Sequence, residues 1–394
     1  MSGPTARRVT DDERRARLAV RHALAPSSRA GTVEDVVRAM TVLHATEPAS
    51  VHLACAARSG ASVADVERAL YDDRSVVKQL AMRRTLFVFP RDLLPAAWGS
   101  ASARVAASER ARMVRDVEQV GLAGDGARWL DERRDEALAA LGDAPDGLTV
   151  TELREAAPGL DVRVVARPTE PWSASRVLTH LGATGDVVRG VNTGRWAISR
   201  PRWTATEHWL GTRAPATSPR EGYRELVGRW LATFGPGTED DLVWWLGSTR
   251  SAVRTALADV GAVPVLLADD TTGWLLPDDL DVVTDPGPWA ALLPVLDPTT
   301  MGWRGRDFYL GEHAAHVVEQ RGNAGTTAWV DGRVVGSWVQ DAAGAVRVAL
   351  LEAVTAGERA ALDEQAQRLT AWLDGTVVGT GYVSAAMAAQ RAGT

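Results

Sequence analysis

Leu43-His44-Ala45-Thr46-Glu47-Pro48 is the stretch around which the rest of the chain is organised. It follows an apolar run and ends at a proline, whose ring disfavours helical backbone in the residue before it. The pattern predicts a helix over residues 33–43, with the histidine and the threonine at its C-terminal end and the glutamate directly after them. A proton acceptor, a hydroxyl and a carboxylate would then lie within four residues. A histidine at a helix end can also be a simple cap that complements the helix dipole, and this alternative stays open.

Composition and charge indicate an ordinary globular protein. The chain has 394 residues, of which 45% are hydrophobic and 24% charged, and this length is typical of two or three domains. A net charge of −6 argues against indiscriminate polyanion binding, although a basic face can exist on an acidic protein. Cys55 is the single cysteine, so we expect neither an internal disulfide nor a cysteine-based metal site.

The chain carries no signal for a membrane or for secretion. No apolar run approaches the roughly 20 residues of a membrane span. The first residues, Met1 to Arg8, are not followed by the apolar core of a secretory signal. We therefore expect a cytoplasmic protein with no membrane partner.

The first 95 residues show the order of elements of a winged helix. A helix is expected from Thr10 to about Ala25, and three shorter ones at 32–43, 51–59 and 62–71, two of which begin at capping patterns. Two strand-like runs follow at 76–80 and 85–89. Arg83 and Arg84 lie at the turn between them, where arginines commonly contact phosphate. Plain solvent exposure is the alternative, because arginine is abundant throughout this chain.

The same order of elements recurs twice. Residues 91–141 are expected to form a helical linker. A capping box at 149–152, a helix at 173–181 and strands at 187–191 and 195–199 then predict a second unit. After a polar connector at 202–220, helices at 223–234, 242–246 and 248–260 and strands at 263–268 and 273–276 predict a third. The copies share element types rather than residues.

The last third of the chain is richer in strands. Runs at 326–330 and 334–339 flank Asp331-Gly332, a strong hairpin signal. A further strand is expected at 346–354 and a helix at 356–373. The sequence thus predicts an α+β fold of three tandem winged-helix modules, at residues 1–95, 96–200 and 201–280, followed by a C-terminal β-rich domain with a terminal helix at 281–394.

At this point the sequence resembles a known family, the winged-helix DNA glycosylases of the AlkZ and YcaQ type, bacterial enzymes that act on alkylated bases and interstrand crosslinks. The resemblance covers about residues 12–375 and rests on the order and spacing of short stretches at 43–48, 81–86, 230–238, 293–297, 321–323 and 330–338. It implies that the modules form a concave face with double-stranded DNA in the concavity. We expect a monomer that uses no cofactor and no metal, since the remaining histidines, including His313 and His316, form no zinc-like set.

The family's catalytic motif is Gln-x-Gln or Gln-x-Asp, and the matching positions here are His44 and Thr46. One interpretation is that the pair does equivalent work on alkylated or bulky-adduct purines, in a setting such as self-resistance to a genotoxin. His44 would then act as a general base with an ordinary pKa of about 6.5, Thr46 would orient the attacking water, and Glu47 would stabilise positive charge on the sugar. The alternative is a non-catalytic DNA-binding protein, a regulator or lesion sensor.

Six residues are candidates for DNA contacts. They are Arg83, Arg84, Asp297, Trp303, Arg304 and Arg306. Asp297 precedes a proline, so a turn or helix-cap role is its alternative, and Trp303 can equally pack in the core.

Overall fold

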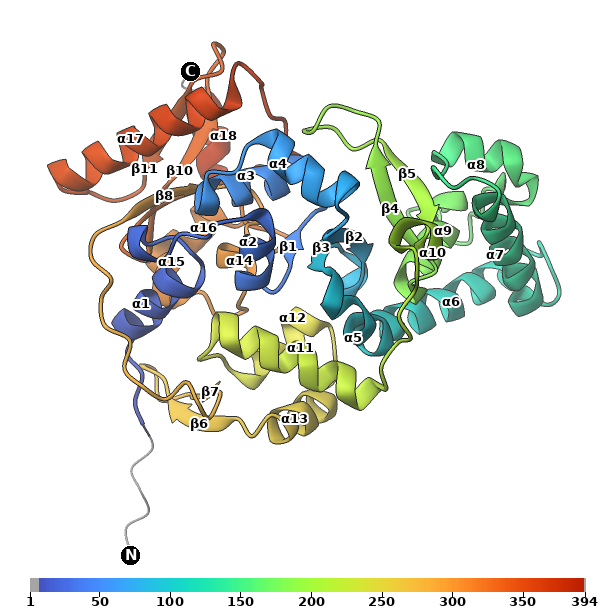
Figure 1. The fold of residues 1–394 in the computed structure, drawn as a ribbon, viewed down its shortest axis with the longest axis horizontal. Coiled ribbons are helices and arrows are strands. Elements are labelled where there is room, and N and C mark those ends of the chain that lie inside the picture. The colour runs from blue at the N-terminus through green and yellow to red at the C-terminus, as the bar shows by residue number, and fades with distance from the viewer. Residues whose placement is uncertain (1–6, 393–394) are drawn as a thin grey trace, which may run out of the picture.

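Three segments of the chain repeat one order of elements: a helix, a short extended piece, two more helices and a β-hairpin (Figure 1). The structure, a computed structural model, describes residues 7–392. Residues 1–6 lie outside the description, and with them most of the stretch from Met1 to Arg8 discussed above, as do residues 393–394. In each segment the extended piece pairs antiparallel with the last strand of the hairpin. We call these segments the first, second and third units.

The first unit spans residues 33–90. Its elements are α2 (Val33–Ala39), β1 (Leu43–His44), α3 (Pro48–Ser59), α4 (Val63–Glu67), β2 (Val76–Leu80) and β3 (Leu86–Pro90). The sheet order is β1-β3-β2, and His44 lies opposite Phe87. Helix α1 (Asp11–Arg21) precedes the unit and is capped by Thr10.

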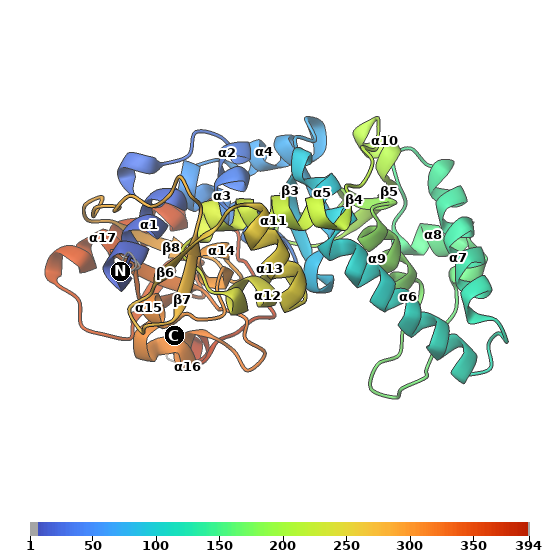
Figure 2. The same ribbon diagram turned by 90° about the horizontal axis from the view of Figure 1, so that it is seen from below.

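The second unit spans residues 126–205. Its elements are α7 (Gly126–Gly142), α8 (Val150–Ala156), α9 (Ala174–Thr184), β4 (Val187–Asn192) and β5 (Pro201–Ala205), and its extended piece is Leu148, which bridges to Trp203. Helices α5 (Leu94–Gly99) and α6 (Ala101–Gln119) lead into it, and α10 (Thr206–Leu210) follows it. The second unit has a hydrophobic core of its own and forms a separate lobe in both ribbon views (Figures 1 and 2).

The third unit spans residues 219–275. Its elements are α11 (Pro219–Phe234), α12 (Glu239–Leu246), α13 (Arg250–Asp259), β6 (Val263–Leu266) and β7 (Thr272–Leu275), and its extended piece is Gly237, which bridges to Trp274. The first and third units share one hydrophobic core, so they form a single body.

The C-terminal segment carries a four-stranded antiparallel sheet of order β11-β10-β9-β8. The strands are β8 (Ala290–Leu293), β9 (Thr327–Val330), β10 (Arg333–Gln340) and β11 (Val346–Leu350), and the helices are α14 (Pro298–Met301), α15 (Asp307–Leu310), α16 (Ala314–Val317), α17 (Ala356–Leu373) and α18 (Ala385–Ala392). The hairpin predicted at Asp331-Gly332 is confirmed: both residues have positive φ, as a two-residue type I′ turn requires.

The structure corrects several predicted boundaries. The helix predicted to reach Leu43 ends at Ala39, because Thr41 takes a left-handed conformation and turns the chain into β1. The linker predicted as continuously helical is broken into α5, α6 and α7. The strand predicted at 195–199 is a loop, and β5 lies instead at residues 201–205, where all but its first residue belong to the predicted connector. In that loop Trp196 packs against His52 and Trp372, a long-range contact that local patterns do not reveal.

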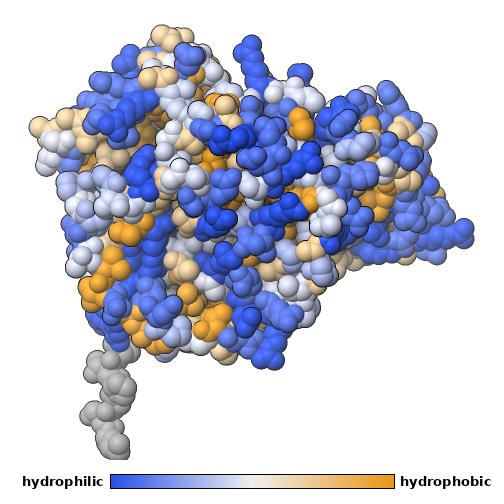
Figure 3. Space-filling model, viewed as in Figure 1, coloured by the Kyte–Doolittle hydropathy of each residue, from blue (hydrophilic) through white to orange (hydrophobic). Residues whose placement is uncertain are grey.

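The surface seen in Figure 3 is mostly hydrophilic, with scattered hydrophobic patches. Among residues 7–392 no helix has both the length and the apolarity needed to cross a bilayer.

Candidate active site

His44 occupies a buried position on β1 rather than a helix end. Its backbone neighbour Ala45 donates to the carbonyl of Leu86, so the sheet holds the histidine in place. The side chain is 8% exposed, and its ring lies edge-on to Phe87 with centroids 5.2 Å apart. Its Nδ1 is buried and has no hydrogen-bond partner among the described residues. A buried polar atom without a partner is costly, which favours a polar ligand or water at this site.

The surroundings keep His44 neutral. Burial, and after it the positive charge of Arg83, lower the pKa of His44 to about 3. The expectation of an ordinary pKa near 6.5 is therefore wrong for this structure, because burial disfavours the charged imidazolium. A group with so low a pKa is a weak general base at neutral pH. It can still donate one hydrogen bond and accept another through its two ring nitrogens.

Thr46 and Glu47 lie in the short connection between β1 and α3. Thr46 is exposed, and its hydroxyl has no partner among residues 7–392. Glu47 is the N-cap residue of α3 but makes no capping hydrogen bond with its side chain. Its Oε1 accepts instead from the backbone N–H of Gly381 at 3.0 Å, so the chain after α17 fixes the position of this carboxylate.

Arg83 lies beside His44 on the turn between β2 and β3. Its guanidinium packs over the ring of Trp244 on α12, 4.5 Å from the ring centroid, and Arg306 packs 5.4 Å from the same ring. Among the described residues neither arginine takes part in an ion pair, and Arg306 donates instead to the carbonyls of Trp303 and Gly322. Burial, and then the charge of Arg306, lower the pKa of Arg83 to about 10. Two guanidinium groups without a counter-charge create a positive site that would suit an anionic ligand such as phosphate.

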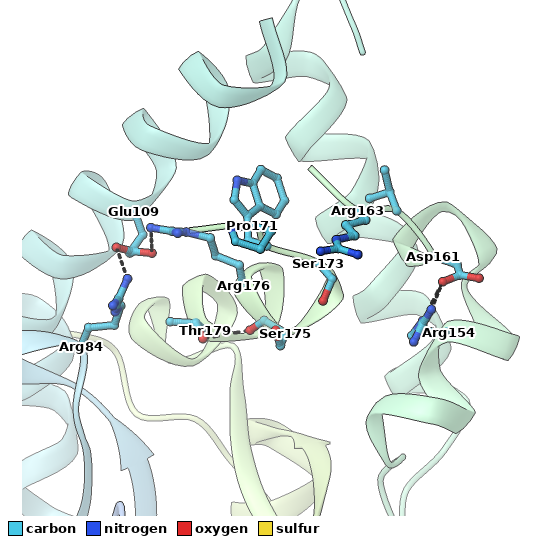
Figure 4. Close-up of a pocket in the computed structure, with 12 residues that line it drawn as sticks. Arg84, Glu109, Arg154, Asp161, Arg163, Pro171, Ser173, Ser175, Arg176 and Thr179 are labelled. Carbon is cyan, nitrogen blue, oxygen red and sulfur yellow. Dashed lines mark hydrogen bonds and ion pairs between the residues drawn. The ribbon is translucent and has the colours of Figure 1, made fainter. Parts of the chain in front are cut away.

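Arg84 points away from this cluster, toward the second unit. Its guanidinium lies 3.4 Å from Glu109 on α6, which also pairs with Arg176 on α9 at 2.9 Å (Figure 4). Arg83 and Arg84 both have positive φ, and this turn sends two consecutive side chains to different neighbours. The two arginines therefore belong to different local sites.

The remaining candidates from the sequence have structural partners. Trp303 is 3% exposed and donates its indole N–H to the carbonyl of Phe234. Arg306 is also largely buried and donates to the carbonyls of Trp303 and Gly322. Arg304 is exposed at the surface, 3.8 Å from Asp240. The predicted DNA contact of Trp303 stays a prediction that its burial does not support.

Asp297 is fully buried in an ion pair. Both of its oxygens accept from Arg58 on α3, at 2.6 and 2.9 Å, and Oδ1 also caps α14 by accepting from the N–H of Thr299. This placement matches the helix-cap alternative and gives a DNA contact no support. Asp297 ties the first unit to the C-terminal segment.

Sequence reasoning missed three residues near these sites: Trp244, Glu109 and Arg176. A signal existed for Trp244, because the helical spacing of α12 buries Leu242, Trp245 and Leu246 and leaves Trp244 partly exposed. Glu109 and Arg176 lie on helices distant in sequence, and only the tertiary structure brings them together. Among the described residues, no group of histidine, cysteine and carboxylate side chains is arranged to hold a metal ion.

Comparison with known proteins assigns the class. The family model described as "DNA glycosylase AlkZ-like" matches residues 37–372, and a repair enzyme of this class acts on DNA. The chain belongs to the AlkZ-like family of DNA glycosylases. Among solved structures, Streptomyces sahachiroi DNA glycosylase AlkZ is similar to it, with a TM-score of 0.73 and 20% identity over 94% of this chain and 98% of that chain. This likeness shows that the two share a fold. A search of curated protein sequences finds no match.

Proposed function

We propose that the protein is a monofunctional DNA glycosylase that hydrolyses the N-glycosidic bond of alkylated or bulky-adduct purines. Membership of the AlkZ-like family supports a glycosylase role. The observation that carries the proposal is His44, a neutral and buried histidine with an unpartnered ring nitrogen beside an arginine that lacks a carboxylate. A neutral imidazole can hold a water molecule without taking its proton.

The residues suggest how base release would proceed. Cleavage of a glycosidic bond passes through a state with positive charge on the sugar. An alkylated purine that is already cationic needs little help to leave, so the protein must mainly place a water and stabilise the sugar. His44 and the exposed hydroxyl of Thr46 would hold that water, and Glu47, fixed by Gly381, would stabilise the cation. Arg83 would hold a neighbouring phosphate.

We further propose that each helix–hairpin unit is a winged-helix module, with borders near residues 95, 200 and 280. The pairing of the extended piece with the last hairpin strand in all three units supports this. A double-stranded DNA substrate would lie in a concave face between the modules, with Arg84 and the exposed Arg304 at its edges. On this proposal the protein works as a cytoplasmic monomer, and self-resistance to a genotoxin is one setting for it.

Incubation with duplex DNA that carries a single N7-methylguanine tests the proposal. Abasic sites would be converted to strand breaks by alkali and counted under single-turnover conditions. We expect breaks at the adduct with the wild-type protein and none with undamaged DNA. If the protein binds this DNA and bulkier purine adducts but releases no base from either, the alternative holds, and the protein is a non-catalytic lesion sensor. The observation that favours this alternative is that His44 and Thr46 stand where the family has Gln-x-Gln or Gln-x-Asp.

A further inference from the structure

We propose that the pocket between the first and second units binds a backbone phosphate of DNA. The inference rests on the proposed function, since it assigns part of the DNA to a pocket in which Arg84, expected from the sequence to contact phosphate, is joined by three arginines of the second unit. The pocket is a cavity of about 550 Å³ between α6, α8, α9 and the turn before β3. Arg84 lines this pocket, whereas the preceding residue, Arg83, packs over Trp244 outside it.

The charge of the pocket favours an anion. Its charged lining residues are Arg84, Arg154, Arg163, Arg176, Glu109 and Asp161. Four guanidinium groups face two carboxylates, which leaves a formal excess of two positive charges. Glu109 is shared between two of the arginines, and Asp161 pairs with Arg154. Arg163 is exposed and has no ion-pair partner among the described residues, so its charge is available to a ligand.

Helix α9 begins at this pocket and adds to its positive potential. Its N-cap residue Ser173 makes no side-chain hydrogen bond to the helix, and Ser173 and Ser175 both line the cavity. The free N–H groups at the start of a helix attract anions. Arg176, in the first turn, is nine-tenths buried, and its Nε has no hydrogen-bond partner within residues 7–392. The same guanidinium pairs with Glu109 through Nη2, so Nε is the group that is left without an acceptor.

The pocket and the proposed active site share the turn between β2 and β3. Arg83 lies beside His44, and the next residue, Arg84, lines the pocket. Consecutive residues are about 3.8 Å apart along the backbone, so one turn connects the two sites. A DNA strand whose lesion lies at His44 could therefore place a flanking phosphate in the pocket. The phosphate contact would orient the duplex, and residues of the first unit would contact the reacting atoms.

The salt dependence of DNA binding tests the proposal. The affinity for an undamaged labelled duplex would be measured by fluorescence anisotropy between 50 and 200 mM KCl. Arg163→Gln should make the slope of log affinity against log salt shallower by about 0.9, the value for one lost phosphate contact. Arg128→Gln is the matched control, because Arg128 is exposed on α7 of the same unit and does not line the pocket. Its slope should equal that of the wild type.

Glu109→Gln changes the charge of the pocket in the direction opposite to Arg163→Gln. It removes a negative charge from the pocket, so DNA should bind more tightly and with a steeper salt dependence. A lower melting temperature without DNA is expected for this variant, since Arg84 and Arg176 lose their shared partner. Weaker DNA binding by Glu109→Gln than by wild type, with both proteins folded, would overturn the proposal.

Two further results distinguish the phosphate site from the proposed glycosylase function and from a site for a free anion. An unchanged slope for Arg163→Gln would overturn the phosphate site even if the wild type releases bases from damaged DNA. A shallower slope would support it even if no lesion is cleaved, because binding to undamaged DNA needs no chemistry. If inorganic phosphate raises the melting temperature of wild type but not of Arg163→Gln while the DNA slopes agree, the pocket takes a free anion and the assignment to DNA is wrong.

Discussion

The junction between the extended piece and the next helix differs sharply between the first unit and the other two. In the second unit Leu148 is followed at once by Thr149, which caps α8 together with Glu152. In the third unit Gly237 is followed by Thr238, which caps α12 together with Asp241. Both junctions are complete capping boxes, in which side chain and backbone satisfy each other.

The first unit has the same topology without the cap. Three residues, Ala45, Thr46 and Glu47, separate His44 from α3, and the N-cap side chain of Glu47 bonds to Gly381 rather than to its own helix. A missing cap typically costs a helix about 1 kcal/mol. The Glu47 carboxylate is thus held by the chain after α17, and the Thr46 hydroxyl beside it is exposed. Departures from local rules of this kind are expected at functional sites.

The largest effect should come from the residue that begins the junction. His44→Ala should slow base release by about 10²–10³-fold, since it removes the group that we propose to position the attacking water, while DNA affinity changes little. Leu148→Ala, the corresponding change in the second unit, should lower stability and leave base release nearly unchanged. Single-turnover rates on one N7-methylguanine duplex would measure both. Equal rates for His44→Ala and wild type would remove the functional difference between the two junctions.

Acid should lower the free energy of unfolding of the protein because the first unit buries two neutral histidines. Burial lowers the pKa of both His44 and His52 to about 3, whereas the unfolded chain protonates near 6.5. The unfolded state therefore binds more protons between these values, so stability is full above pH 6.5 and falls as the pH drops below it. Each histidine should contribute a loss of about 1.4 kcal/mol per pH unit.

Urea unfolding of wild type and His44→Gln at pH 7.0 and 5.5 measures this. The variant should lose less stability on acidification than wild type, and His208→Gln, at an exposed position on α10, should behave like wild type. Base release should show no acid limb near pH 6.5, because His44 stays neutral there. A limb near pH 6.5 that His44→Gln abolishes would mean that the histidine titrates normally.

Loss of the threonine should lower the stability of the capped third unit more than that of the uncapped first unit. Thr238→Ala removes a cap of α12 and should lower the free energy of unfolding by about 1 kcal/mol. Thr46→Ala, at the uncapped junction, should change it by less than about 0.5 kcal/mol, as is usual at exposed positions. Urea unfolding of the two variants gives the comparison directly. A similar loss for both would show that Thr46 is a cap in solution.

The smallest expected effect concerns the hydroxyl of Thr46. Thr46→Val keeps the side-chain shape and removes one neutral hydrogen bond to the proposed water, which corresponds to about a 3- to 10-fold slower base release. The measurement is the same single-turnover rate at saturating protein. No change in rate would mean that Thr46 does not hold the proposed water and that His44 alone does.

Much of the architecture was predictable because it depends on local chemistry. Capping boxes at Thr32, Ser62, Thr149 and Thr238 correctly mark helix starts. The turn at Asp331-Gly332 correctly marks a hairpin. The boundaries that failed depend on contacts with distant residues. His44 is extended because β3 offers it a hydrogen-bonding edge, and residues 195–199 form a loop in which Trp196 packs on Trp372.

The sequence by itself determined the repeating order of helices and hairpins, the C-terminal hairpin and the position of the unusual junction at residues 43–48, because capping, turn chemistry and periodicity act over a few residues. Only the tertiary structure decided which polar groups are buried, paired or left without a partner. It placed Asp297 in an ion pair with Arg58, brought Arg176 to Glu109, and surrounded His44 so that its pKa falls to about 3. Burial and charge neighbours depend on segments far apart in the chain, and these alone set the electrostatics of the site.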